Sequence, residues 1–281
     1  MKQSSTILAL AGFFGLLAPA SQAAITAVPG DLLSAFYSFD NTTEVVGNNT
    51  YIRNLGPASV FRDTATAIFF TNINTDLTTA FGPNWHTSGQ VRWGLIGAIP
   101  QSSPTTAGDP NRTSYFSQPN GGLARNSSSF SIGSAERGGL ANNITSVVNS
   151  SNGAPTTLLE GAAFAAVNGG AIIPISSIND YSEVQPPTAS DWFSLSVNTN
   201  TDLTAGIAGT NGLDLYRVVN ATTGAVVTHA NSPGNITVGA FKYVGSFELT
   251  GTGGLSFVPE PTAGLLAGLC ALAGFRRRRS S

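Results

Sequence analysis

The chain has 281 residues, of which 41% are apolar and 10% charged, so the composition excludes the weakly hydrophobic, highly charged class of disordered proteins. Between Ala24 and Pro261 the net charge is −7, and Lys242 is the only lysine there, which excludes the basic surface of a nucleic-acid-binding protein. The single cysteine, Cys270, lies near the C-terminus, so the rest of the chain has no disulfide, thiolate metal site or cysteine nucleophile.

The N-terminus has the pattern of a secretory signal peptide. A short positive start is followed by an apolar run over Ile7–Ala18 and by small residues at Ser21 and Ala23. The run is too short for a transmembrane helix and is followed by Pro19. We therefore expect residues 1–23 to be a signal peptide that is handled by the secretion translocon and cut by signal peptidase between Ala23 and Ala24.

Short apolar runs bounded by turn residues fill the next part of the chain, which is the pattern of strands. The predicted strands are Leu33–Phe39, Tyr51–Leu55, Ala67–Ile73, Val91–Ile96, Ala163–Val167, Trp192–Val197, Leu213–Val219 and Phe241–Leu249. Glycine is abundant, at 32 residues, as is usual where turns are many. The pattern predicts a mainly β fold, an antiparallel β-sandwich-like domain.

Helices are expected to be few and short. One is predicted through Phe81, with Asp76 or Thr75 as its N-terminal cap and Gly82-Pro83 as its end, and a second over Ser134–Val148. Near the end, Tyr243–Leu249 and Leu255–Phe257 flank a glycine-rich turn and predict a β-hairpin.

Two polar, proline-bearing stretches, Gln101–Asp109 and Gln185–Thr188, read as long loops. A division into two domains near residue 105 or 187 is the alternative, but neither stretch is long enough to require it. We expect one exported β-rich domain over residues 24–257.

The C-terminal segment, residues 258–281, combines three features in order. Val258, Pro259, Glu260 and Pro261 come first, the uncharged stretch 262–275 follows, and a basic stop completes it, made of Arg276, Arg277, Arg278 and Arg279. As a helix, the fourteen-residue stretch spans about 21 Å, short of a bilayer core of about 30 Å, so it predicts a marginal transmembrane helix. The positive-inside rule keeps the arginines cytoplasmic and places the body outside, as does the signal peptide.

These three parts together resemble a PEP-CTERM protein-sorting domain. The resemblance covers the last two dozen residues and implies processing by an exosortase, a membrane-embedded enzyme of bacteria that make exopolysaccharide. The two prolines favour an extended, stiff peptide at the membrane surface, which suits recognition by a processing enzyme. For Cys270 we favour a small apolar residue over a lipidation site.

Several short stretches of the body resemble the N-terminal half of a group of PEP-CTERM proteins of unassigned function. They are Asp31–Phe36, Tyr51–Gly56, Asp76-Leu77 with Phe81–Trp85, and Val91–Gly94. This resemblance implies a recurring envelope module and no particular activity.

The sequence shows no clear catalytic motif, and we expect a protein that is not an enzyme and has no cofactor, metal or catalytic residue. His86 and His229 lie far apart, and no serine stands in a G-x-S-x-G motif. Candidate acids for a glycosidase, such as Asp180 with Glu183, or Asp191 near Trp192, are no better than others in the chain.

Two segments, Asn72–Thr78 and Asn198–Thr204, share the pattern N-x-N-T-D-L-T, in which oxygen-bearing side chains alternate as in calcium loops. Both lack the glycine and the bidentate acid of an EF-hand, so Asx-turns or helix caps explain the pattern more simply.

The tryptophans raise an alternative function. Trp85, in a loop-like context, is the candidate for an exposed sugar contact, whereas Trp93 lies within a predicted strand and is expected in the core.

The prediction is an exported cell-surface or extracellular-matrix protein, first held in the inner membrane and then sorted by exosortase, with a structural or adhesive role near exopolysaccharide or in a biofilm. The alternative is a carbohydrate-binding module or polysaccharide-active enzyme. Trp85 beside acids on a concave surface would favour that alternative, and buried tryptophans would count against it.

Overall fold

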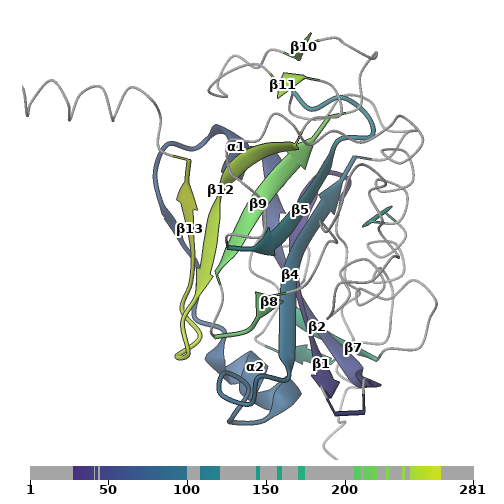
Figure 1. Cartoon of the computed structure of the whole chain (residues 1–281), viewed down its shortest axis with the longest axis vertical. Coiled ribbons are helices and arrows are strands. Elements are labelled where there is room, and N and C mark those ends of the chain that lie inside the picture. The colour runs from purple at the N-terminus through teal and green to yellow at the C-terminus, as the bar shows by residue number, and fades with distance from the viewer. Residues whose placement is uncertain are drawn as a thin grey trace, which may run out of the picture.

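The computed structural model of the protein describes residues 28–40, 42–43, 45–99, 108–120, 144–145, 157–159, 170–174, 206–209, 212–219, 226–227, 236–237 and 241–260. Within them the chain is mainly β, its strands pair antiparallel, and helices are few and short (Figure 1). The predicted fold class is confirmed at this level.

The elements follow one another with short helices between early strands. The strands are β1 (Asp31–Asp40), β2 (Val45–Pro57), β3 (Ile68–Phe69), β4 (Val91–Ala98), β5 (Ser114–Pro119), β6 (Thr157–Leu159), β7 (Gly170–Pro174), β8 (Gly206–Ile207), β9 (Leu213–Val218), β10 (Val226–Val227), β11 (Ile236–Thr237), β12 (Phe241–Leu249) and β13 (Leu255–Pro259). The helices are α1 (Ala58–Asp63) and α2 (Asn74–Phe81).

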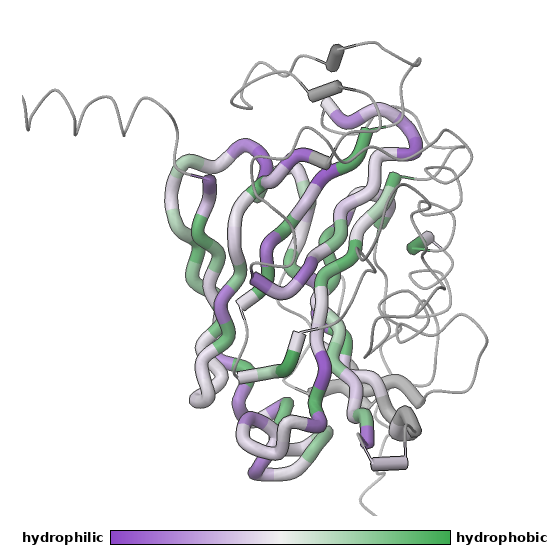
Figure 2. The backbone as a smooth tube through the Cα atoms, viewed as in Figure 1, coloured by the Kyte–Doolittle hydropathy of each residue, from purple (hydrophilic) through white to green (hydrophobic). Residues whose placement is uncertain are grey.

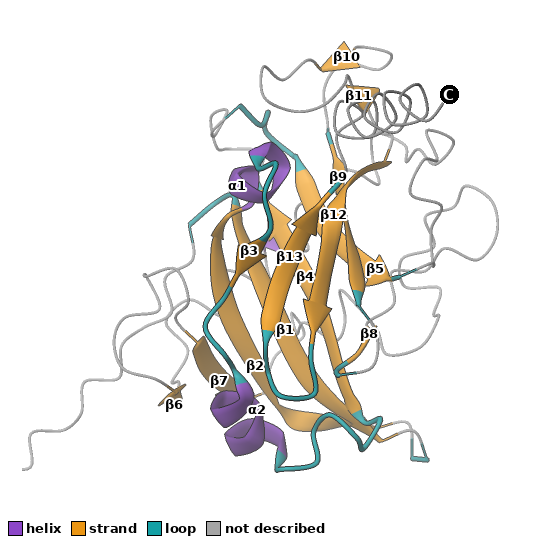
Figure 3. Cartoon of the chain, turned by 90° about the vertical axis from the view of Figure 1, so that its left-hand side faces the viewer, coloured by secondary structure: helices purple, strands orange, loops and turns teal. Residues whose placement is uncertain are grey.

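Eleven of the described strands form one sheet. Its order is β3-β13-β12-β9-β5-β4-β1-β2-β7-β6, with β8 added on β4, while β10 and β11 pair separately. The sheet curls strongly, so that β12 and β13 come to lie across from β1 and β2 (Figure 3). A single curled sheet thus encloses the core that two faces of a sandwich would otherwise form.

The central strands are buried along their whole length. Every residue of β4 is buried, and so are most residues of β1, which pairs with it. Phe36 lies opposite Trp93 in this pair, and their rings stack with centroids 5.6 Å apart. Burial on both faces explains why these strands read as nearly continuous apolar runs.

Other strands alternate more clearly between apolar and polar residues, as Figure 2 shows along β9 and β12. In β9, Leu213 and Leu215 belong to the core cluster, and Asp214 between them faces the other side of the sheet. The alternation fixes the pairing register, since a slip by one residue would exchange the two faces.

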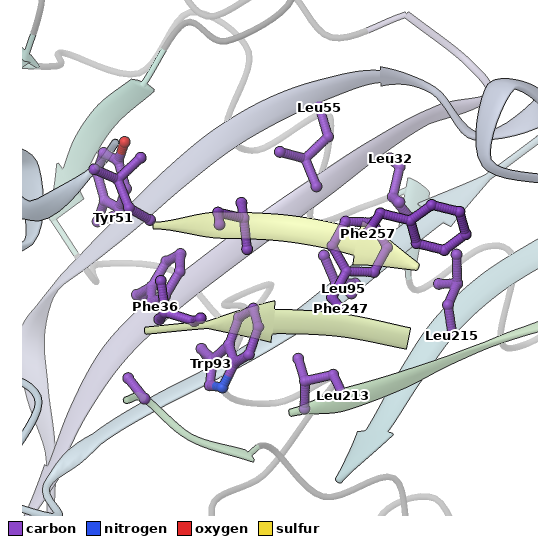
Figure 4. Close-up of a cluster of buried hydrophobic side chains, with 14 of the residues drawn as sticks. Leu32, Phe36, Tyr51, Leu55, Trp93, Leu95, Leu213, Leu215, Phe247 and Phe257 are labelled. Atoms are coloured by element: carbon purple, nitrogen blue, oxygen red, sulfur yellow. The ribbon is translucent and has the colours of Figure 1, made fainter. Parts of the chain in front are cut away.

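The core joins side chains from both ends of the curled sheet (Figure 4). Phe36, Tyr51 and Leu55 come from β1 and β2, and Phe247 and Phe257 come from β12 and β13. Since these strands are distant in sequence, the core depends on closing the sheet over itself.

Helix α1 covers one end of this core. Phe61 packs against Phe247 and Phe257 with ring centroids 5.3 and 5.2 Å apart. The Ala58 N–H donates to the Gly30 carbonyl at 2.8 Å, which ties the start of the helix to the start of β1.

Helix α2 closes the other end, and its prediction from the sequence is confirmed. It begins at Asn74, before the expected cap, and ends at Gly82, whose φ of 85° suits glycine. The expected cap by Thr75 or Asp76 is wrong, because the helix already begins at Asn74 and both residues lie inside its first turn. Just before the helix, the Asn72 side chain accepts the Asn74 N–H at 2.8 Å.

The predicted hairpin between β12 and β13 is confirmed. Its turn docks on α2, since the Gly253 carbonyl accepts the Ile73 N–H at 2.9 Å and the Thr252 carbonyl accepts from the Asn72 amide at 2.7 Å. Gly253 has a φ of 80°, and a Cβ there would collide with the backbone of Asn74, so this turn requires glycine.

Other predictions fare differently. The strand expected over Ala67–Ile73 is reduced to the two residues of β3, because the following residues turn to meet the hairpin. The strands predicted over Ala163–Val167 and Trp192–Val197 lie outside the described residues, as does the helix over Ser134–Val148 except for residues 144–145, which are helical. Strands on either side of the two long loops pair in one sheet, β4 with β5 and β5 with β9.

Candidate sorting site at the end of the last strand

The structure describes the first three residues of the predicted sorting motif, Val258, Pro259 and Glu260, and places them at the end of β13. Leu255 and Phe257 point into the core, whereas Val258 is exposed. The motif therefore begins inside the folded sheet, directly after the last core residue of the chain that the structure describes.

Backbone pairing with β12 fixes the orientation of residues 258–260. Val258 lies opposite Ser246 and Pro259 opposite Gly245, and the Glu260 N–H donates to the Val244 carbonyl at 3.1 Å. Peptide groups of alternate residues in a strand point to the same side, so those of Val258 and Glu260 face β12. Pro259 points away from β12, toward the side where β3 reaches only as far as Phe257.

This open edge suits a proline. Proline has no N–H to offer a neighbouring strand, so it costs the sheet nothing at a position with no partner. The same residue blocks further pairing by another chain along this edge. The motif is thus bonded on one side through β12 and open on the other.

Two backbone features of β12, a bulge at Val244 and a glycine at position 245, allow the motif to pair closely with it. The pairing of β12 with β9 shifts register between Tyr243 and Gly245, so Val244 forms a bulge, and its carbonyl is the group that holds Glu260. A Cβ on Gly245 would lie 2.5 Å from the Phe257 ring and 2.6 Å from the Val258 carbonyl oxygen. Glycine is therefore required for β13 to approach this closely.

Glu260 has a basic neighbour. Its Oε2 lies 3.7 Å from the Lys242 Nζ, and both side chains are about a quarter to a third exposed. A pair of this length and exposure contributes at most a few tenths of a kcal/mol to stability, about what surface pairs usually give. The glutamate is accessible rather than locked in place.

Buried polar groups support β12 behind the motif. The Ser246 Oγ donates to Asp214 Oδ1 at 2.6 Å and lies 2.7 Å from the Tyr243 hydroxyl. Asp214 is fully buried on β9. Sequence reasoning missed this group, although the alternation of β9 places Asp214 away from the core cluster.

A second buried polar cluster lies near α1. Asp109 Oδ1 is 2.7 Å from Arg62 Nη1 and 2.5 Å from Arg217 Nη2, and Asp109 Oδ2 accepts from the Tyr115 hydroxyl at 2.8 Å. Burial, reinforced by Asp109, raises the pKa of Tyr115 well above its ordinary value. Burial alone would lower the pKa of Arg62, but Asp63 and Asp109 raise it, so the guanidinium stays charged. Sequence reasoning missed this cluster too, because Asp109 falls in a stretch that reads as a loop.

The predicted sugar contact at Trp85 is wrong. The side chain is 1% exposed, and its Nε1 donates to Asn74 Oδ1 at 3.1 Å. The loop after α2 folds the indole under the sheet, so a ring that looked loop-like in sequence packs in the core. Trp93 is buried as expected, and Trp192 lies outside the described residues.

Of the other candidate groups, the structure describes only His86. His86 packs edge-on against Trp85, with ring centroids 5.2 Å apart. His229, Asp180, Glu183 and Asp191 lie outside the described residues. Within the described part of the chain, no three His, Cys, Asp or Glu side chains come together as metal ligands would.

The first copy of the repeated pattern, Asn72–Thr78, has its oxygens engaged by the protein. Asn72 bonds the Asn74 N–H, Asn74 accepts from Trp85, and Asp76 Oδ2 accepts from the Tyr51 hydroxyl at 2.5 Å. These bonds agree with the simpler interpretation of the pattern as turn chemistry. The second copy, Asn198–Thr204, lies outside the described residues.

The remaining predicted sites lie outside the described residues. They are the cleavage position between Ala23 and Ala24, Pro261, the apolar stretch 262–275 and the basic stop Arg276–Arg279. Among the helices that the structure does describe, none has the length and apolar character needed to cross a membrane.

Comparison with known proteins adds no assignment to this geometry. No protein-family model, curated protein or solved structure matches the chain.

Proposed function

We propose that the protein is an exported cell-surface or extracellular-matrix protein, sorted by an exosortase through residues 258–281, with a structural or adhesive role near exopolysaccharide or in a biofilm. The observation that carries the proposal is the placement of the motif at the boundary between the folded sheet and the tail. Among the residues that the structure describes, Phe257 is the last core residue and Glu260 is the last one that β12 holds.

This placement supports processing without damage to the body. A cut after Glu260 would leave the pairing of β13 and every contact of Phe257 with the core. No neighbouring strand covers Pro259 on its open side, so an enzyme can approach the extended peptide there without displacing a part of the sheet that the structure describes.

The proposed route uses both ends of the chain. The signal peptide over residues 1–23 directs export, and the helix over residues 262–275 holds the precursor in the inner membrane with Arg276–Arg279 on the cytoplasmic side. The body is then a sandwich-like module in which the curled sheet packs β12 and β13 against β1 and β2 (Figure 4).

A structural role is supported by how the body uses its acids. Three buried carboxylates, Asp76, Asp109 and Asp214, each accept a hydrogen bond from a hydroxyl of another element. These acids serve the fold instead of facing a ligand. The alternative of a carbohydrate-binding module or polysaccharide-active enzyme loses its one named contact with the burial of Trp85.

The test replaces the motif without touching the core. Pro259→Ala combined with Glu260→Ala removes the proposed recognition residues, and Glu248→Ala removes an exposed carboxylate of β12 as the matched control. In the native host, we expect the double variant to keep its C-terminal tail and stay with the membrane, while the control is processed like the parent.

Thermal unfolding of both variants checks that the body still folds. Release of the double variant with the mass of the processed parent would overturn the proposal that the motif is read.

A further inference from the structure

Four large apolar side chains are prominently exposed in the described part of the chain. Phe69 is 81% exposed, Val28 55%, Val60 48% and Val258 46%. We call these four residues the α1–β3 face. Exposed apolar groups that cluster mark an interaction surface, whereas scattered ones do not, so their positions decide the matter.

Register places two of the four on the same side of the sheet. Phe69 lies opposite Ser256, and alternation puts Val258 on the same face as Ser256. Ile68 and Phe70, on either side of Phe69, pack against the core, so Phe69 must point outward. Phe69 and Val258 are therefore diagonal neighbours on adjacent strands.

The other two residues lie at the end of the sheet that α1 covers. Val60 is on α1, whose neighbouring residue Phe61 packs on Phe257 of β13. Val28 precedes Gly30, whose carbonyl accepts the first N–H of α1. Figures 1 and 3 both show α1 at the end of the molecule opposite α2.

The chain leaves the sheet for its apolar tail at this same end. β13 runs toward α1, and only two residue steps separate Glu260 from Thr262, where the uncharged stretch begins. Two extended residues span at most about 7 Å, which is the largest distance possible between Glu260 and Thr262. Four span about 14 Å, which is the limit between Val258 and Thr262. A membrane that holds residues 262–275 is thus within a short tether of the α1–β3 face.

We infer that the α1–β3 face rests on a lipid bilayer while the chain retains its C-terminal segment. The headgroup region on each side of the hydrocarbon core is about 5–8 Å thick, so a tether of this length keeps Val258 in or next to it. The inference rests on the proposed function only in requiring that residues 262–275 insert in a membrane.

The charges near the face are compatible with this contact. Lys242 and Glu260 lie 3.7 Å apart and offset each other, and the Arg62 side chain is buried against Asp63 and Asp109. Glu248 shares the row of Ser256 and Phe69 but lies two strands inward from Phe69. The lipid contact is therefore confined to the β3 edge and α1 and does not extend over the whole outer face.

The test measures lipid proximity at single positions of the full chain. Cys270→Ala removes the native thiol, and an environment-sensitive fluorophore is then attached at Phe69→Cys, with Val60→Cys as a second reporter. Thr79→Cys is the control, an exposed position on α2 at the far end. Each protein is reconstituted into vesicles of phosphatidylethanolamine and phosphatidylglycerol that carry a nitroxide on the lipid headgroup.

We expect the labels at positions 69 and 60 to lose most of their emission to the nitroxide, and the label at 79 to lose little. Equal quenching at all three positions, or no quenching at 69 and 60, would overturn the inference. If the protein still floats with the vesicles in that case, the membrane anchor itself stands. A label at 69 that becomes shielded only as protein concentration rises would mean that a second copy covers the face, and that also overturns it. Failure of the chain to float with vesicles would refute the membrane anchor and this inference together.

Discussion

Gly245 lies directly opposite Pro259, and the absence of a side chain on Gly245 lets the predicted sorting motif pack closely on β12. The space that a Cβ would need is filled by the Phe257 ring and the Val258 carbonyl. The bulge at Val244 then supplies the carbonyl that holds Glu260. One glycine thus links packing of the core to presentation of the motif.

Gly245→Ala should therefore destabilise the body and loosen the end of β13. Overpacking of this kind typically costs about 1–3 kcal/mol. Chemical unfolding should show the loss, and hydrogen exchange should show faster exchange at the Glu260 amide. Ser256→Ala, on the adjacent outward-facing position of β13, is the control and should leave both nearly unchanged. Equal stability of Gly245→Ala and the parent would contradict the close approach of the two strands.

Asp109 should be among the most sensitive residues of the body. Asp109→Asn leaves Arg62 and Arg217 without their shared carboxylate, and breaking a buried ion pair typically costs about 3–5 kcal/mol. Asp63→Asn removes a more exposed partner of the same Arg62 and should cost well under half as much. Denaturant midpoints of the two variants test this order, and the account fails if Asp63→Asn is the more damaging change.

Stability should fall at high pH. Burial and the charge of Asp76 raise the pKa of Tyr51, and burial and Asp109 raise that of Tyr115, so the fold keeps both phenols protonated. The unfolded chain releases these protons from about pH 10, so the stabilisation is complete below that pH and is lost as the pH rises above it. The slope should reach at most about 1.4 kcal/mol per pH unit for each phenol.

Urea unfolding at a series of alkaline pH values measures this slope. Tyr51→Phe and Tyr115→Phe should each reduce it, whatever they do to stability at neutral pH. An unchanged slope in both variants would show that these phenols are not the groups responsible.

Trp85 should contribute to the free energy of unfolding through its burial in the core. Trp85→Phe removes the bond to Asn74 while keeping most of the apolar contact, so we expect a loss of about 1 kcal/mol. Trp85→Ala should cost about 3–5 kcal/mol, as large-to-small changes in a core do. Thermal or denaturant unfolding tests both, and a Trp85→Ala variant as stable as the parent would contradict its burial.

Sequence alone predicted the elements whose signals are local. Helix α2 has a glycine stop, the β12–β13 hairpin has a glycine-rich turn, and β1, β4 and β9 have strong apolar patterns. Each of these is found where it was expected, within a residue or two at most ends. Their patterns report burial that adjacent residues in the chain already determine.

Elements created by tertiary contacts were missed. β5 is polar in sequence, yet Ser117 and Gln118 are buried because β4 and β9 pair on its two sides. In sequence, Asp109 reads as an acid in a loop, because its partners Arg62 and Arg217 come from distant elements that only the fold brings next to it. Trp85 looked exposed because it follows Gly82-Pro83 in a loop, and only the three-dimensional structure shows that this loop returns the indole to Asn74 at the start of α2 and into the core.

The most direct measurement of the central claim is the intact mass and cell fraction of the protein in its native host, with and without the exosortase. We predict that the tail beyond the motif is missing, and the body found outside the cell, only when the exosortase is present. A protein that keeps Arg276–Arg279 and stays in the membrane in both strains would show that the C-terminal segment is an anchor alone and would contradict the account.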